Sequence, residues 1–215
     1  MKGSILVTGF EPFGGERTNP SWLVAQALDG QRIAGRPVHA ICLPCTFGEA
    51  LQVLQAGLQA RKPAVVLALG QAAGRGDLSI ERVAINVDDA HIPDNAGAQP
   101  VDEAVIAGAP AAYFSSLPIK AMVAALREAG LPASVSQSAG TYVCNHVFFG
   151  LMHALRRRRG VRAGFMHLPL LPEQVAAHPG LPSLPLAAQV QGLSVALHTA
   201  VTCVEDLRAE GGSLA

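Results

Sequence analysis

Cys144 stands in a sequence context that is typical of a nucleophilic cysteine. In SAGTYVCNHVFF, a glycine-bearing turn leads into a predicted helix whose first turn holds the thiol. A thiol in that place lies near unpaired backbone N–H groups and the positive end of the helix dipole, which lower its pKa and favour the thiolate. The same N–H groups can hold the oxyanion of a tetrahedral intermediate. The alternative is a small buried core residue, as most lone cysteines are.

A thiolate nucleophile needs a general base, and His167 has the most suitable position among the seven histidines. It ends a predicted apolar strand, and catalytic groups gather at the carboxyl ends of strands in open parallel sheets. His146 lies about 200° around the helix from Cys144, and His153 lies roughly 13.5 Å along it. Neither can make the short hydrogen bond that general-base catalysis requires. From its position alone, His167 is equally well explained as a core histidine bonded to the backbone.

A third residue, an acid that orients the imidazole, would complete a triad. Glu81 is a candidate because it begins the predicted apolar strand ERVAINV, where an unpaired carboxylate would be costly. A solvated residue at a strand end is the alternative for Glu81. The other candidates, Asp88, Asp89, Asp94 and Asp102, lie in polar loop sequence, where turn-forming roles explain them well. The residues favour Glu81 only slightly over Asp94.

The elements that must position these residues alternate between apolar runs and helix-period segments. This alternation predicts βαβ units and a mostly parallel sheet. Strands are predicted at residues 4–8, 38–43, 64–69, 83–87, 133–136 and 163–168, and helices at 19–28, 46–61, 118–129, 144–156 and 185–204. The strand at 64–69 is the most continuous apolar run, so we expect it to be central and buried on both faces. Residues 70–82 are predicted to be mostly loop, and 91–108 a long irregular excursion.

Composition places these elements in one α/β domain that spans residues 1–215. Half of the residues are apolar, which is enough for a sizeable core, and sixteen basic residues balance sixteen acidic ones. This balance gives no general attraction to nucleic acid or to an anionic membrane surface. A nearly neutral surface makes self-association easier, so a homo-oligomer is a reasonable expectation.

The compartment is predicted to be the cytoplasm. No stretch of about 18 apolar residues exists to span a membrane, and the N-terminus MKGSILVTGFEPFGG has no secretion-signal pattern. The four cysteines show no paired spacing typical of zinc ligands. Without an export signal disulfides are not expected, so free thiols are available for chemistry.

Two other classes of function find weaker support in the residues. The loops GFEPFGG and GQAAGR could cradle a phosphate, but they match neither the Walker pattern nor the dinucleotide fingerprint. The four arginines Arg156–Arg159 could contact nucleic acid. They are more simply cations at the negative end of a helix dipole. Neither a nucleotide-binding nor a nucleic-acid-binding protein is therefore favoured.

Several long motifs resemble those of type I pyroglutamyl peptidases. They are LVTGFEPFGG at 6–15, GQAAGR and ERVAIN within 70–86, IPDNAGAQPV at 92–101, and GTYVCNH at 140–146. GAPAAYFSSLPIK, GLMHAL and FMHLPLLPEQ extend the resemblance over nearly the whole chain in order. It implies a single-domain three-layer α/β/α sandwich with a twisted, mostly parallel central sheet. It also implies a cysteine peptidase that removes an N-terminal pyroglutamyl residue from peptides through a thioester acyl-enzyme.

The resemblance also assigns roles to individual residues. It implies Cys144 as nucleophile, His167 as general base and Glu81 as orienting acid, with no metal or organic cofactor. Phe10 and Phe13 match positions that sandwich the lactam ring. The other positions implied for the substrate pocket are Gln71, whose backbone would meet the lactam, and His91, Ile92, Tyr142 and Val143. Members of the family often form homo-oligomers.

This sequence departs from the family pattern at three positions. His91 stands where members commonly have an arginine near the oxyanion, Tyr142 replaces a common phenylalanine, and Ala73 replaces a glycine. The histidine side chain is shorter, and its charge depends on pH near neutrality. The alternative function is therefore a catalytically weakened relative with altered specificity.

Overall fold

A seven-stranded sheet organises the chain, as seen in a computed structural model that describes residues 3–212. Its strands are β1 (Ile5–Phe10), β2 (Arg32–Ile33), β3 (Arg36–Leu43), β4 (Val65–Gln71), β5 (Leu78–Glu81), β8 (Ala133–Ser136) and β9 (Arg162–Leu168). Their order across the sheet is β2-β3-β1-β4-β9-β5-β8. The pairs β2–β3 and β5–β9 are antiparallel and the other neighbours are parallel. The prediction of a mostly parallel sheet is confirmed.

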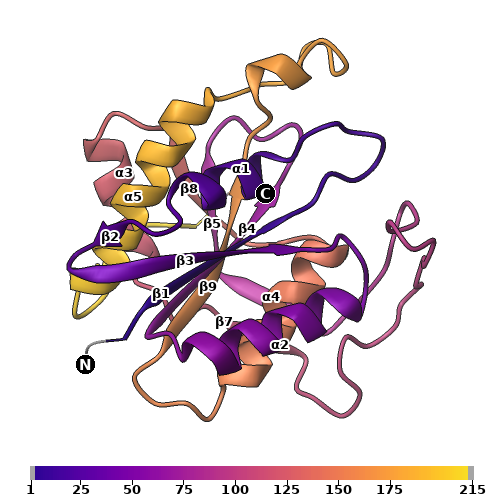
Figure 1. The fold of residues 1–215 in the computed structure, drawn as a ribbon, viewed down its shortest axis with the longest axis horizontal. Helices are drawn as coiled ribbons and strands as arrows, with labels where there is room; N and C mark the ends of the chain where they lie inside the picture. The colour runs from indigo at the N-terminus through magenta and orange to yellow at the C-terminus, as the bar shows by residue number, and fades with distance from the viewer. Residues whose placement is uncertain (1–2, 213–215) are drawn as a thin grey trace.

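Five helices cover the two faces of this sheet (Figure 1). One face carries α1 (Pro20–Ala27), α3 (Ile119–Glu128) and α5 (Leu186–Thr202), and the other carries α2 (Glu49–Arg61) and α4 (Val143–Leu155). Each face has its own apolar core: Leu67 and Leu69 of β4 point into one, Val66 and Ala68 into the other. The structure is therefore the three-layer α/β/α sandwich that was predicted, with β4 buried on both faces.

Local sequence signals account for several of these elements. Asn19 caps α1 by accepting a hydrogen bond from the backbone N–H of Ser21, and Pro20 begins the helix, where its missing N–H is not needed. In α3, the periodic apolar positions Ile119, Met122, Val123 and Leu126 are all buried. Among residues 3–212, no helix is long and apolar enough to cross a membrane.

The predicted start of the second helix was wrong. α2 begins at Glu49, and its N-cap is Gly48, which has φ 76°. A positive φ favours glycine, and the glycine turns the chain out of the preceding loop. The Thr46 hydroxyl makes only a long contact, 3.5 Å from the Glu49 carboxylate.

The prediction that residues 70–82 are mostly loop missed a strand. β4 extends to Gln71, and β5 occupies Leu78–Glu81. The LSIE segment alternates apolar and polar residues, but all four are buried, because Asp77 and His167 supply partners for the polar side chains. Glu81 therefore ends one strand and does not begin the next. The segment after it forms β6 (Val83–Ile85), which pairs with the unpredicted β7 (Ala112–Phe114) outside the main sheet.

Candidate active site

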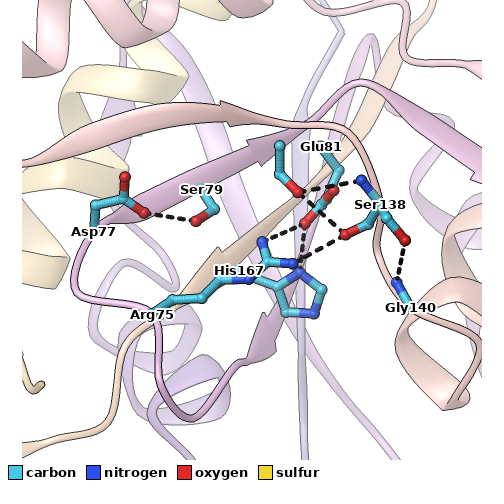
Figure 2. A network of polar contacts seen from close by, with 8 residues as sticks. Arg75, Asp77, Ser79, Glu81, Ser138, Gly140 and His167 are labelled. Atoms are coloured by element: carbon cyan, nitrogen blue, oxygen red, sulfur yellow. Dashed lines mark hydrogen bonds and ion pairs between the residues drawn. The ribbon is translucent and has the colours of Figure 1, made fainter. Parts of the chain in front are cut away.

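The buried pair of Glu81 and His167 forms the centre of the candidate site (Figure 2). Glu81 Oε1 lies 2.7 Å from His167 Nδ1, and the two side chains are 0% and 5% exposed. An ionised carboxylate can only accept hydrogen bonds, so Nδ1 carries the proton and donates it. In the neutral imidazole, Nε2 is then left without a proton. This is the tautomer that a general base needs.

The strand positions explain why these two side chains meet. β5 runs antiparallel to β9, with Ser79 opposite His167 and Ile80 opposite Met166. Glu81 follows at the end of β5, on the same face of the strand as Ser79. The pair joins residues 86 positions apart in the sequence.

Burial sets the protonation state of His167. The pKa of its imidazole is lowered from the ordinary value, chiefly by desolvation, while the hydrogen bond and charge of Glu81 oppose this and Arg75 reinforces it. Desolvation disfavours the charged imidazolium. His167 therefore rests as a neutral base that can accept a proton.

Cys144 lies in the first turn of α4, directly above Gly70 of β4. A Cβ atom built on Gly70 would stand 2.7 Å from Cys144 Sγ. In the sheet register Gly70 is the partner of His167, so the thiol lies over the strand position beside the imidazole. The ring of Phe165 packs against His167, with 4.9 Å between the ring centroids. Cys144, His167 and Glu81, which are far apart in the sequence, thus gather at one end of the sheet.

The predicted lowering of the Cys144 thiol pKa was wrong. Burial raises this pKa, the neighbouring Cys45 and the charge of Glu81 add to the rise, and only the Arg75 guanidinium opposes it. Loss of hydration disfavours the charged thiolate. The resting site holds a neutral thiol beside a neutral imidazole, so a thiolate forms only when His167 takes the proton.

Gly70→Ala is expected to damage the site more than the fold. The added methyl would meet Cys144 Sγ at 2.7 Å and Phe165 Cζ at 2.8 Å, so the thiol or the ring must move. Misplacement of a reacting atom by about 1 Å can cost about 10²-fold in rate, and overpacking costs about 1–3 kcal/mol of stability. Steady-state kinetics and thermal unfolding check both effects. Gly212→Ala is a matched control, since no atom lies within 4 Å of its added Cβ. Wild-type activity in Gly70→Ala would contradict this placement of the thiol.

Asn145 and His146, the two residues after Cys144, hold the first turns of α4 in place through hydrogen bonds. Asn145 accepts a hydrogen bond from the Ile85 N–H at 3.0 Å and donates to the carbonyls of Ile85 and Val87 at 2.9 Å. His146 turns away from the thiol, as predicted, and its Nε2 accepts from the Gly48 N–H at 3.0 Å. These contacts hold the nucleophile's helix against β6 and the start of α2.

Two aspartates of the polar loops have structural partners. Asp88 Oδ2 lies 2.7 Å from His146 Nδ1, and both side chains are buried; the turn-forming interpretation of Asp88 was therefore wrong. Sequence reasoning missed this contact because 58 positions separate the two residues. Asp94 accepts from the backbone N–H groups of Phe47, Ala96 and Ala98. It orders its own loop, which leaves Glu81 as the carboxylate that contacts His167.

The residues proposed for a substrate pocket fall into an exposed and a buried group. Phe13 and Tyr142 are half-buried, with ring centroids 6.0 Å apart, and Tyr142 Oη donates to the Pro93 carbonyl at 3.1 Å. Ile92 is 39% exposed and its Cδ1 lies 3.9 Å from the Cβ position of Gly14. These contacts bring the loops 11–16, 91–94 and 141–143 together.

The remaining pocket candidates do not all share this surface. Phe10 and Val143 are 2% and 0% exposed and belong to the core between the sheet and α4. Gln71 is half-buried, and its side-chain carbonyl accepts from Gln174 Nε2 at 3.1 Å. The His91 side chain is exposed.

In the described part of the chain, no group of three or more histidine, cysteine, aspartate or glutamate side chains is arranged to hold a metal ion.

The chain is similar to known proteins over nearly its whole length. A family model described as pyroglutamyl peptidase matches residues 3–203. The pyrrolidone-carboxylate peptidases of Erwinia tasmaniensis and Chromobacterium violaceum are 58% and 59% identical over 209 and 211 residues. The alignments cover 97% and 98% of this chain, and 98% and 99% of those proteins.

Solved structures of such enzymes have the same fold. The crystal structure of pyroglutamyl peptidase I from Bacillus amyloliquefaciens has a TM-score of 0.94 and 41% identity, covering 98% of this chain and all of that one. A mutant pyrrolidone carboxyl peptidase from Pyrococcus furiosus has a TM-score of 0.91 and 41% identity, covering 94% of this chain and 99% of its own. By sequence and by fold, the chain belongs to the pyroglutamyl peptidase family.

Proposed function

We propose that this protein is a cysteine-type peptidase that hydrolyses the bond after an N-terminal pyroglutamyl residue of peptides. The observation that carries the proposal is the buried Glu81–His167 hydrogen bond beside the Cys144 thiol in the first turn of α4. A nucleophile, a base within reach of it and an acid that orients the base are the parts of nucleophilic acyl transfer. No metal or organic cofactor takes part in this chemistry.

The proposed reaction has two steps. His167 Nε2 takes the Cys144 proton as the sulfur attacks the pyroglutamyl carbonyl, and the first-turn N–H groups of α4, which lack intrahelical acceptors, face the developing oxyanion. The imidazolium then protonates the departing amine, and a thioester remains. Water, deprotonated by His167, hydrolyses this acyl-enzyme and restores the thiol. Because the resting pair is neutral, charge separates only during attack, where Glu81 stabilises the imidazolium.

The substrate end would be recognised as an uncharged ring. A pyroglutamyl residue has no free α-amine, so its lactam suits half-buried aromatic walls better than an acidic amine-binding site. Phe13, Tyr142 and Ile92 are the partly exposed side chains of the loops 11–16, 91–94 and 141–143 that can form such walls. We propose that Phe10 and Val143 support these walls from the core, and that Gln71 and His91 supply polar contacts.

Hydrolysis of a fluorogenic pyroglutamyl amide, beside the corresponding glutaminyl amide with its free amine, tests this proposal. Selective cleavage of the lactam substrate is the expected result. If reduced, folded protein cleaves neither amide at any pH, the peptidase proposal fails. Cleavage of the glutaminyl amide instead would favour a relative with altered specificity, and His91 and Tyr142 would be the residues to exchange.

The pH dependence of kcat/KM should follow the protonation of His167. Its pKa is lowered from the ordinary value of 6.5, and only the neutral imidazole can take the thiol proton. Activity is therefore expected to persist below pH 6.5 and to fall as more acidic pH protonates the base. A fall of kcat/KM toward acidic pH, the acid limb of the profile, that already begins above pH 6.5 would contradict this. The same limb in His91→Asn would show that the exposed His91 does not cause it.

We also propose a cytoplasmic location and a homo-oligomeric state. All four cysteines are free in the described part of the chain, which suits a reducing compartment. A formal net charge of zero leaves little repulsion between copies of the chain. Light scattering after size-exclusion chromatography tests the oligomer, and a monomeric mass at working concentration would exclude it.

A further inference from the structure

Arg75 makes a direct contact with the acid of the triad. It lies in the loop between β4 and β5, and its Nη1 donates to Glu81 Oε1 at 2.7 Å. The same oxygen accepts from His167 Nδ1 at 2.7 Å, so the guanidinium and the imidazole converge on one carboxylate oxygen (Figure 2). The Arg75 side chain is 29% exposed while that of Glu81 is fully buried. The guanidinium thus stands between the carboxylate and solvent.

A second hydrogen bond ties Arg75 to the chain segment that leads to the nucleophile. Arg75 Nη2 donates to the Ser138 carbonyl at 2.9 Å. Ser138 in turn accepts through its hydroxyl from the Gly140 N–H at 3.1 Å, and α4 with Cys144 begins three residues later at Val143. One planar guanidinium therefore connects the acid at the end of β5 to the turn that enters the nucleophile's helix.

The backbone of the Arg75 loop is itself held at the site. The Arg75 N–H donates to the Ala72 carbonyl at 3.3 Å, and the Ala72 N–H donates to the Leu168 carbonyl at 2.9 Å, one residue after His167. Gly74 has φ 87°, which permits the tight reversal that aims residue 75 back at the sheet. These hydrogen bonds hold the loop of Arg75 next to the general base His167.

We propose that Arg75 is a positioning residue of this active site, which holds the Glu81 carboxylate oriented toward His167 and fixes the turn before Cys144. The inference rests on the proposed function, because it gives Arg75 a part in the same proton transfer. A forked, permanently charged guanidinium suits two acceptors that lie in fixed directions, whereas a lysine ammonium offers one point charge.

The charge of Arg75 has a further consequence for both reacting groups. The other oxygen of Glu81, Oε2, is buried and has no hydrogen-bond partner among residues 3–212, so Arg75 is the cation that balances this carboxylate. The charged groups that shift the pKa of His167 are Glu81 and Arg75, and the groups that shift the pKa of Cys144 are Cys45, Glu81 and Arg75. Arg75 lowers the pKa of His167 and that of Cys144. It thereby limits how strongly Glu81 raises the basicity of the imidazole.

Two variants separate the charge of Arg75 from its geometry. Arg75→Met removes both, and kcat is expected to fall about 10–100-fold, as for other groups that orient a reacting residue, with little change in KM. Because the pKa of His167 rises when the cation is lost, the acid limb of kcat/KM is expected to move to higher pH. Arg75→Lys keeps the charge but loses the fork, so kcat should fall while the limb stays near its wild-type position.

Arg127→Met is the matched control. Arg127 donates through Nε to the Ala133 carbonyl at 2.8 Å at the end of α3, away from the triad. Its removal is expected to lower thermal stability slightly and to leave kcat and the acid limb unchanged. If Arg75 had a purely structural role, Arg75→Met would behave like Arg127→Met: thermal stability would fall and the acid limb would not move.

The rate of Cys144 alkylation by iodoacetamide across pH gives a readout that needs no peptide substrate. In Arg75→Met, its rise with pH is expected at higher pH than in the wild type. If wild-type protein cleaves the pyroglutamyl amide and Arg75→Met keeps both kcat and the two pH profiles, the role of Arg75 is refuted while the proposed function stands. If wild-type protein does not cleave the amide, the proposed function fails, and an unmoved alkylation profile in Arg75→Met would refute the positioning role as well.

Discussion

Cys144→Ser is expected to lower kcat/KM for a pyroglutamyl amide by about 10⁴–10⁶-fold, the loss that removal of a nucleophile from such a unit produces. The serine hydroxyl fits the space above Gly70, so the fold and the Glu81–His167 pair should persist. The hydroxyl is far less acidic than a thiol, and the site gives it little help, because burial already opposes formation of a thiolate there. His167 would therefore have to remove a much less acidic proton in the same apolar surroundings.

The matched control for this variant is Cys203→Ser. Cys203 caps the end of α5 and contacts the Glu205 carbonyl, so its exchange removes a thiol without touching the triad. Steady-state kinetics should show wild-type rates for Cys203→Ser. Mass spectrometry after iodoacetamide treatment should find the activity-linked label on Cys144. If Cys144→Ser retained more than about a hundredth of the wild-type kcat/KM, Cys144 would not be the nucleophile.

Glu81→Gln is expected to lower kcat by about 10³–10⁴-fold, as loss of the orienting acid does in other triads. A glutamine can turn its NH₂ group toward His167, and Nδ1 must then accept. That places the imidazole proton on Nε2, where it blocks transfer from the thiol. The variant also removes the charge that would stabilise the imidazolium during attack. Arg75 is partly exposed and can be hydrated when its ion pair is lost, so the fold should survive.

The acid limb separates this variant from Arg75→Met. Glu81 raises the pKa of His167, so its neutralisation should move the limb of the residual activity to lower pH, opposite to the shift expected for loss of Arg75. Glu128→Gln, at the exposed end of α3, is the control and should keep the wild-type kcat and limb. A loss of less than about tenfold in Glu81→Gln would show that His167 is oriented by other groups.

Interactions between residues that are close in the sequence can be predicted from it, so several elements could be predicted from residues alone. The cap of α1 depends on Asn19, Pro20 and Ser21, which are adjacent in the chain. The apolar run of β4 indicated that this strand is buried on both faces. The periodic apolar positions of α3 indicated which side of the helix packs against the core. The turn SAGTY, followed by an apolar helix, placed Cys144 at a helix start. In each case the interacting residues lie within a few positions of one another.

The same sequence left the roles of its acids and bases open. His167 was equally well explained as a core histidine, and Glu81 stood only slightly ahead of Asp94, because His167 and Glu81 are remote from each other in the sequence. The family resemblance favoured the catalytic roles of His167 and Glu81 by comparison with other sequences. The residues of this chain alone did not decide between the alternatives. The strand LSIE was predicted as loop for a similar reason, since Glu81 is satisfied by His167, which only folding brings near.

The alternating α/β architecture, most of its helices and strands, and the helix start that carries the thiol follow from the sequence alone. Tertiary structure alone decided that Glu81 meets His167 across 86 positions, that Asp88 pairs with His146, and that Arg75 stands over the acid. It also reversed the expected direction of the Cys144 pKa shift. The physical reason is the same in each case. Hydrogen bonds and desolvation depend on which distant groups share a small volume, and that is a property of the packed chain and not of any local segment.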